Sequence, residues 1–230
     1  MSDADDTKLR LLETAGMVFA EKGFRAATVR EICQRAGVNL ASVNYHFGDK
    51  ERLYIESVKR AHFCRGQQLP APSWPDGTPA ETRLRDVIRG LLERMLSAPD
   101  TAWHGQLMMR ELQQPTAACV ELVRDYMRPQ FELICSILRE LLPDDASDEK
   151  LRLVAFGIVG QCLHLRLGRN VIGMLAPREE LRHYQADFLS EHIADWTLAA
   201  IAGLRLRQEQ SLRLRQEQGL QLGQEEGAGR

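Results

Sequence analysis

The amino-acid sequence predicts an all-α fold in which a small module of three short helices precedes a larger helical domain. Apolar residues recur at three- and four-residue spacing along most of the chain, which is the period of a helix. No stretch combines sustained apolar–polar alternation with β-branched residues, the pattern typical of strands. The long interruptions are polar or rich in proline, so we expect loops there and helices elsewhere.

The first helix is expected from about Thr7 to Lys22, because its apolar residues form one stripe. These residues are Leu9, Leu12, Ala15, Val18 and Phe19. Gly23 is expected to end this helix, as glycine often does at a C-terminus. Thr28 can cap the second helix, and Glu31 is placed to complete a capping box. This second helix ends near Ala36.

Gly37 supplies a tight turn before a third short helix, expected from about Leu40 to His46. Short helices with a glycine turn between the second and the third are the arrangement of a helix-turn-helix. The Gly48–Asp49 pair then breaks the chain. Asp49 can cap a fourth helix, expected from Lys50 to about Gln67.

A proline-rich loop over residues 69–79 cannot continue that helix and separates the module from the rest of the chain. At least five helices are expected after the loop, over Ala80–Ser97, Asp100–Gln113, Thr116–Leu142, Asp148–Gly173 and Arg178–Gly203. Pro129 lies inside the third of these and is expected to kink or split it. We therefore predict a small helix-turn-helix module at residues 1–66 and a larger helical domain at 67–203.

Residues 204–230 form a polar tail that contains an internal repeat. The octapeptide Gly-Leu-Arg-Leu-Arg-Gln-Glu-Gln at 203–210 recurs with one change at 211–218 and in degenerate form at 219–226. A period of eight is neither a heptad nor an eleven-residue repeat, so the leucines drift around a helix and form no seam. We expect a frayed helical or disordered extension, with a functional tail as the alternative.

The composition is that of an ordinary globular protein, with 44% apolar residues, 27% charged residues and a formal net charge of -2. Between Gly23 and Arg65, eight basic residues stand against four acidic ones, which is the sign expected for a nucleic-acid-binding module. Five cysteines, an odd number without a CxxC pair, predict reduced thiols. The N-terminus is unlike a signal peptide and no run resembles a membrane span, so we expect a cytoplasmic protein without membrane contact.

One motif is much more specific than these patterns. Residues 28–53 read Thr-Val-Arg-Glu-Ile-Cys-Gln-Arg-Ala-Gly-Val-Asn-Leu-Ala-Ser-Val-Asn-Tyr-His-Phe-Gly-Asp-Lys-Glu-Arg-Leu. The capping threonine, the Ala-Gly-Val turn, the Tyr-His-Phe segment and the Lys-Glu-x-Leu helix start closely resemble the TetR family of transcriptional regulators, over about residues 8–60. The stretch Arg-Glu-Leu-Gln-Gln-Pro-Thr at 110–116 resembles one subgroup. The resemblance implies a ligand-responsive regulator, most often a repressor, that binds a palindromic double-stranded DNA operator as a dimer.

The candidate DNA-binding residues lie at the start of the second helix, along the third helix and at the start of the fourth. Free amide groups and the positive dipole end at Thr28 and Arg30 favour a phosphate. Asn44 can donate to and accept from an adenine edge, although many relatives have tyrosine there, and small neighbours let the helix enter the major groove. Leu40 or Ala41 can meet a thymine methyl group. Tyr45, His46 and Lys50 are placed to reach phosphates. The full set is Thr28, Arg30, Asn39, Leu40, Ala41, Ser42, Asn44, Tyr45, His46 and Lys50.

The larger domain is expected to dimerise and to bind an unknown small-molecule effector. Broad apolar faces over 148–173 and 178–203 predict the homodimer interface, with ordinary core as the alternative. The candidate ligand-binding residues combine apolar bulk with a few polar groups; they are Trp103, His104, Met108, Tyr126, Met127, Phe131, Gln161 and His164. Arg110 or Arg166, if inside the pocket, would favour an anionic ligand.

Other classes of function are less well supported. Cys64 near His62, or His104 with Glu111, could be described as catalytic dyads, but no nucleophile elbow, HExxH or phosphate loop accompanies them. We therefore expect no enzyme activity, no catalytic or metal-binding residues and no cofactor. A ligand-binding or scaffold protein that has lost DNA binding is a second alternative. Activator and repressor both remain open from these residues.

Overall fold

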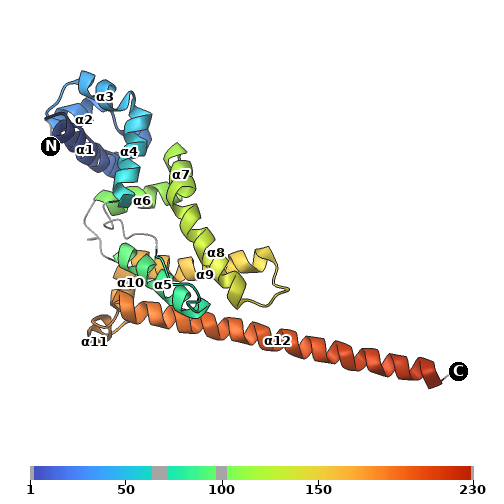
Figure 1. Cartoon of the computed structure of the whole chain (residues 1–230). Helices are drawn as coiled ribbons and strands as arrows, with labels where there is room; N and C mark the ends of the chain where they lie inside the picture. The colour runs from blue at the N-terminus through green and yellow to red at the C-terminus, as the bar shows by residue number, and fades with distance from the viewer. Residues whose placement is uncertain (1–2, 64–71, 97–102, 229–230) are drawn as a thin grey trace. The chain divides into compact units, whose positions relative to one another are not determined.

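The computed structural model describes residues 3–63, 72–96 and 103–228 (Figure 1). Within these ranges every regular element is helical, as the sequence predicts. The chain divides into two compact units. Unit 1 comprises Met1–Ala71 with Glu93–Gln130, and unit 2 comprises Pro72–Leu92 with Phe131–Arg230.

Unit 1 contains the four N-terminal helices together with a second segment of the chain. Its elements are α1 (Asp3–Ala26), α2 (Val29–Ala36), α3 (Leu40–Phe47), α4 (Lys50–Phe63), α6 (Trp103–Gln113), α7 (Ala117–Leu122) and the π-helical turn η1 (Val123–Met127). The predicted end of the fourth helix, at 64–67, lies outside the described residues. The predicted start of the α6 helix, at 100–102, lies outside them as well.

The core of unit 1 is shared between these two segments. Phe19 of α1, Ile32 of α2 and Leu53 of α4 are fully buried there. Leu107 and Met108 of α6 belong to the same cluster. The N-terminal helices therefore do not form a core of their own, because α6 completes it.

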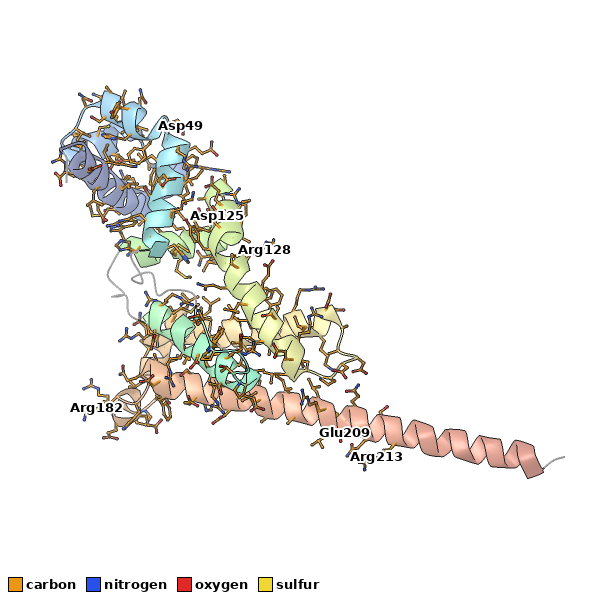
Figure 2. The ribbon with its side chains drawn as sticks, viewed as in Figure 1. Asp49, Asp125, Arg128, Arg182, Glu209 and Arg213 are labelled. Carbon is orange, nitrogen blue, oxygen red and sulfur yellow. The ribbon has the colours of Figure 1, made fainter. Side chains whose placement is uncertain are left out.

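Local signals fix the short helices as predicted. The Thr28 Oγ1 accepts from the Glu31 N–H at 3.2 Å and caps α2. Gly37 ends α2 with a φ of 65°, a left-handed conformation that glycine adopts without strain. Asp49, labelled in Figure 2, caps α4 by accepting from the Arg52 N–H at 2.7 Å. Gly23 interrupts α1 with a φ of 77°, so the break is where the sequence predicts it.

The second half of the predicted capping box is wrong. The Glu31 carboxylate does not return to its own helix start but accepts from Lys22 at 2.7 Å and pairs with Arg35 at 2.8 Å. With Lys22 and Arg35 both donor and acceptor are charged, and two such ion pairs hold the carboxylate more strongly than one neutral backbone N–H would.

Unit 2 is made of longer helices. They are α5 (Ala80–Leu96), α8 (Arg128–Leu141), α9 (Asp148–Leu167), α10 (Arg169–Leu175), α11 (Arg178–Leu181) and α12 (Ala186–Ala228); α5 ends and α8 begins within unit 1. Leu84, Ile88, Ile137 and Ile158 are buried in this unit. Arg85 of α5 also pairs with Glu191 and Asp195 of α12.

Three of the predicted long helices are divided. Pro129 has no N–H for the carbonyl of Asp125, and the chain accommodates this with the wide turn η1, in which the Arg128 N–H donates to the Val123 carbonyl. The predicted helix 148–173 breaks at Gly168 into α9 and α10. The predicted helix 178–203 is also wrong in its bounds, because α11 ends at Leu181 and α12 begins at Ala186.

Helix α12 continues through the octapeptide repeat to Ala228 (Figure 1). Leucine, arginine, glutamine and glutamate are all good helix formers, so the repeat can stay helical without an apolar seam.

The four described cysteines, Cys33, Cys119, Cys135 and Cys162, are free thiols, as predicted. Cys64 lies outside the described residues. In the part of the chain that the structure describes, no single helix is long and apolar enough to cross a membrane. The α9–α10 pair reaches that length and composition together, but with a bend of 76° between the two helices.

Candidate nucleic-acid interface

The interface is built around α3, a helix of eight residues. Val43 and Phe47 lie one turn apart and are buried, which anchors the inner face of the helix in the core of unit 1. Asn39 caps the N-terminus of α3, where its Oδ1 accepts from the Ser42 N–H at 2.9 Å and from the Ser42 Oγ at 3.0 Å. The outer face is therefore held rigidly while remaining open to a partner.

The residues predicted to read bases are exposed on that outer face. Leu40 is 56% exposed, and Ala41 and Asn44 are also exposed. The side chains are short and none projects as a long charged group, so the first turns of α3 can approach a groove closely. The N-terminal half of α3 thus combines rigid backbone, hydrogen-bonding groups and small apolar groups.

The residues predicted to contact phosphates lie at the start of α2, in the last turn of α3 and at the start of α4. Tyr45 is 81% exposed, and Arg30 at the start of α2 is exposed as well. His46 is partly buried, with its ring 4.9 Å from that of Tyr45. Two helix N-termini, at α2 and α3, add positive dipole ends.

Lys50 is more constrained than the sequence suggests. Its Nζ donates to the Arg25 carbonyl at 3.5 Å and lies 4.7 Å from the centre of the Phe24 ring. The ammonium group is thereby held at one place beside the end of α1. A cation held in this way can meet a phosphate with less loss of side-chain entropy than a free lysine.

Not every cation of unit 1 contributes to a positive surface. Lys22 and Arg35 share Glu31, and Arg35 also pairs with Glu21 at 2.9 Å. The hydrogen bond from Lys22 lowers the pKa of the Glu31 carboxyl, with the Arg35 charge adding to the effect. Glu21 and Glu31 therefore neutralise Lys22 and Arg35. The cations that the prediction assigns to phosphates are instead Arg30 and Lys50.

Residues of α6 that the sequence analysis treats as pocket candidates lie against the N-terminal helices. Trp103 donates from its Nε1 to Glu13 at 3.2 Å, and its ring occupies the space that a side chain at Gly16 of α1 would need. Arg110 does not lie inside a pocket, since it is exposed and donates to the carbonyls of Ala20 and Glu21 at 2.7 and 2.8 Å.

The predicted ligand-binding residues are divided between the units. Trp103, His104, Met108, Tyr126 and Met127 belong to unit 1, and Phe131, Gln161 and His164 belong to unit 2. Met108 is buried in the core of unit 1. Arg166 on α9 is buried within unit 2. A cavity of about 370 Å³ lies between the α8–α9 connection and α12 and is lined by none of these residues.

Sequence reasoning missed Glu111 as a structural residue. It is 1% exposed and accepts hydrogen bonds from the Tyr54 hydroxyl and from Thr116. In the sequence, Glu111 stands in the stretch 110–116 and near His104, and neither observation indicated a partner in α4.

Comparison with known proteins agrees with this arrangement. Residues 11–56 match the family described as bacterial regulatory proteins, tetR family. Residues 80–204, more than half of the chain, match the C-terminal domain of the HTH-type transcriptional dual regulator CecR. The chain belongs to the TetR family of bacterial transcriptional regulators, in the group with a CecR-type C-terminal domain.

Individual relatives are named as regulators of transcription. The HTH-type transcriptional dual regulator CecR of Shigella flexneri is 28% identical over 178 residues, which are 73% of this chain and 79% of that protein. The HTH-type transcriptional repressor AcnR of Corynebacterium efficiens is 33% identical over 88 residues, 38% of this chain and 42% of AcnR. A tetR-family regulatory protein of Rhodococcus RHA1 has the same fold, with a TM-score of 0.58 at 18% identity over 87% of this chain and 98% of that one. The protein is thus a DNA-binding regulator of transcription.

Proposed function

We propose that this protein is a ligand-responsive repressor that binds a palindromic operator as a homodimer and leaves it when a small-molecule effector binds. The observation that carries the DNA-binding half is the rigid, outward-facing N-terminal half of α3. Its inner residues are buried and its cap is satisfied, while Leu40, Ala41 and Asn44 remain exposed. The name of the relative AcnR, a transcriptional repressor, supports repression as the direction of control.

In this proposal the exposed residues divide into those that read bases and those that position the module. Asn44 hydrogen-bonds the edge of an adenine, and Leu40 or Ala41 meets a thymine methyl group. The phosphate-contacting residues, which fix register without reading sequence, are Thr28, Arg30, Tyr45, His46 and Lys50. Asn39 and Ser42, whose side chains are used in the helix cap, line the start of α3.

The dimer half of the proposal is supported by the outer surface of α9 and α12. Leu153 and Phe156 on α9 are 61% and 57% exposed, and Phe188 and Trp196 on α12 are 54% and 61% exposed. Gly157 and Gly160 have open space where a Cβ would be, so another helix can approach α9 closely. Exposed apolar surface of this kind is typical of an interface between protein chains.

The effector half of the proposal rests on the five candidate residues that lie in unit 1, which are Trp103, His104, Met108, Tyr126 and Met127. We propose that the effector is a small, largely apolar molecule, since all of these except His104 are tryptophan, tyrosine or methionine. Release from DNA then requires that the effector binds the two conformations of the dimer with different affinity.

The first test is binding of the purified full-length protein to fluorescent duplexes from the DNA upstream of its own gene, followed by anisotropy at two salt concentrations. Selective binding should weaken as salt rises, because cations displaced from the phosphates are released into solution. Equal, weak binding to every duplex would contradict sequence-specific regulation at that site. Compounds that lower the anisotropy of the selected duplex identify effectors in the same assay.

The variant Asn44→Ala tests the reading of bases. We expect selective affinity to fall by a factor of about 5 to 150, the equivalent of one lost bidentate contact, with little change in non-selective affinity. Asn170→Ala on α10, also exposed, is the matched control and should leave both affinities unchanged. Equal affinities of the Asn44→Ala variant and the wild type for the selected duplex would show that Asn44 does not contact a base.

A further inference from the structure

The stretch 110–116 contains two adjacent residues that hold two different helices of the DNA-binding module. Arg110 and Glu111 are neighbours on α6, and neither belongs to α2 or α3. Arg110 is exposed, whereas Glu111 is almost completely buried. Their contacts extend about 50 to 90 positions back along the chain, into α4 and α1.

Arg110 closes the end of the first part of α1. The break at Gly23 leaves the preceding carbonyl groups without the N–H donors that a continuing helix would supply. Arg110 provides them, since its Nε donates to the Ala20 carbonyl at 2.7 Å and its Nη2 to the Glu21 carbonyl at 2.8 Å. A Cβ at Gly23 would lie 3.3 Å from the Arg110 Nη1, so the guanidinium fits closely against the break.

Glu111 holds α4 through a hydrogen bond from Tyr54. Its carboxylate accepts from the Tyr54 hydroxyl of α4 and, at 3.1 to 3.3 Å, from the Thr116 Oγ1 and N–H. Thr116 in turn caps α7 by accepting from the Ala118 N–H at 3.1 Å. A buried carboxylate needs all of these donors, because each one that is lost leaves charge without compensation.

The two attachments meet inside the module. The ring of Tyr54 packs edge-on against Phe19 of α1 with a centroid distance of 4.8 Å, and against Phe24 with one of 5.0 Å. Phe24 also lies under the ammonium group of Lys50. The Arg110–Glu111 pair is therefore connected through one layer of packed aromatic rings to a residue at the proposed DNA surface.

We infer that Arg110 and Glu111 are positioning residues for operator binding: together they fix α1 and α4 on α6, and so fix the orientation in which α3 is presented. This inference rests on the proposed function, in which a homodimer binds a palindromic operator, and it needs no effector. A dimer must present two recognition helices at the spacing of successive major grooves, about 34 Å apart. Looser α1 and α4 would spread α3 over many orientations, which weakens selective binding while leaving the phosphate contacts of either subunit available.

The test uses the full-length variants Arg110→Ala and Tyr54→Phe. Arg110→Ala removes a surface side chain, and Tyr54→Phe removes one hydroxyl group while keeping the packed ring, so both are expected to fold. We expect each to weaken binding to the duplex selected by the wild type roughly tenfold. Affinity for an unrelated duplex should stay within about twofold, because it depends on phosphate contacts.

Matched controls separate positioning from general effects. Arg139→Ala removes an exposed arginine that pairs with Asp148, and Tyr184→Phe removes a hydroxyl group that donates to Glu180; both lie in unit 2 and should bind as the wild type does. Arg110→Lys should recover part of the loss, since an ammonium group can donate to the same carbonyls.

Three results would bear on the inference differently. Folded Arg110→Ala and Tyr54→Phe proteins that bind the selected duplex within about twofold of the wild type would overturn it. Equal losses for selected and unrelated duplexes would also overturn it, because they would indicate only a destabilised module. Failure of the wild type to select any duplex would instead count against the proposed operator binding itself.

Discussion

The two units of this protein differ in what they leave exposed. Unit 1 buries most of its large apolar side chains in one core. Around α3 it exposes mainly short and polar groups, apart from Leu40 and Tyr45. Among the described residues of this unit, the other exposed large apolar ones are Met17, Leu112 and Val120. Unit 2 buries a core of its own, yet Leu153, Phe156 and Trp196 stay exposed on α9 and α12. The polar surface around α3 is stable in water without a partner chain. The exposed apolar side chains of α9 and α12 are unfavourable in water until another surface covers them.

The comparison teaches that the units are stabilised in different ways. The short helices of unit 1 depend on caps, turns and on α6, which arrives from later in the chain. The long helices of unit 2 depend on burial along their length, and the proposed dimer contact completes that burial. Substitutions should therefore reveal packing defects in unit 1 and association defects in unit 2.

The largest expected effect concerns Cys162, which is fully buried in unit 2 below the exposed face. Burial raises the pKa of its thiol from 9.0 to about 12, so at pH 8 the reactive thiolate should be about a thousandfold scarcer than for an ordinary thiol. Alkylation with iodoacetamide, followed by mass spectrometry over time, should modify partly exposed Cys135 well before Cys162. Equal rates for the two cysteines would mean that the core of unit 2 opens readily.

The next effect concerns the proposed dimer surface. Trp196→Glu places a charge on the exposed face of α12, and we expect the protein to become a monomer of 26.1 kDa by analytical ultracentrifugation. Operator affinity should fall about a hundredfold, because the two half-sites are then bound independently. Val120→Glu on α7, an equally exposed apolar residue of unit 1, should stay dimeric. A dimeric Trp196→Glu protein would show that Trp196 does not lie in the dimer interface.

A smaller effect is expected where α1 meets α6. Gly16→Ala would bring a Cβ to 2.2 Å from the Trp103 ring, and forcing the two helices apart should lower the free energy of unfolding by about 1–3 kcal/mol. Gly203→Ala in α12 has open space around its Cβ and should raise that free energy by about 0.5–1 kcal/mol. Denaturant titrations of both variants measure the difference, and equal stabilities would show that α6 is not held against α1.

The sequence predicted best where the determining signals are local. Thr28, Gly37 and Asp49 lie next to the helix ends that they define, so their roles could be inferred from neighbours alone. The exposed face of α3 followed from the same reasoning. The odd and scattered cysteines likewise indicated free thiols without knowledge of the fold.

The contacts of α6 were not predictable in this way. Trp103 and Arg110 read as pocket residues because an aromatic ring and a guanidinium near apolar neighbours suit a ligand site. Their partners in α1 are about 90 positions earlier, and no periodicity in the sequence relates the two segments. The η1 turn was anticipated only as a kink at Pro129, since many local distortions can accommodate a missing N–H.

The eight-residue repeat inside α12 gives this helix an unusual response to genetic change. Each residue of an α-helix advances about 1.5 Å and 100°, so one octapeptide advances about 12 Å and leaves the helix turned by about 80°. Slippage during replication that added or removed one unit would keep the reading frame and the helix-forming character of the segment. It would nevertheless turn the end of the helix by nearly a quarter of a circle, so whatever lies beyond would point in a new direction after a single copying error.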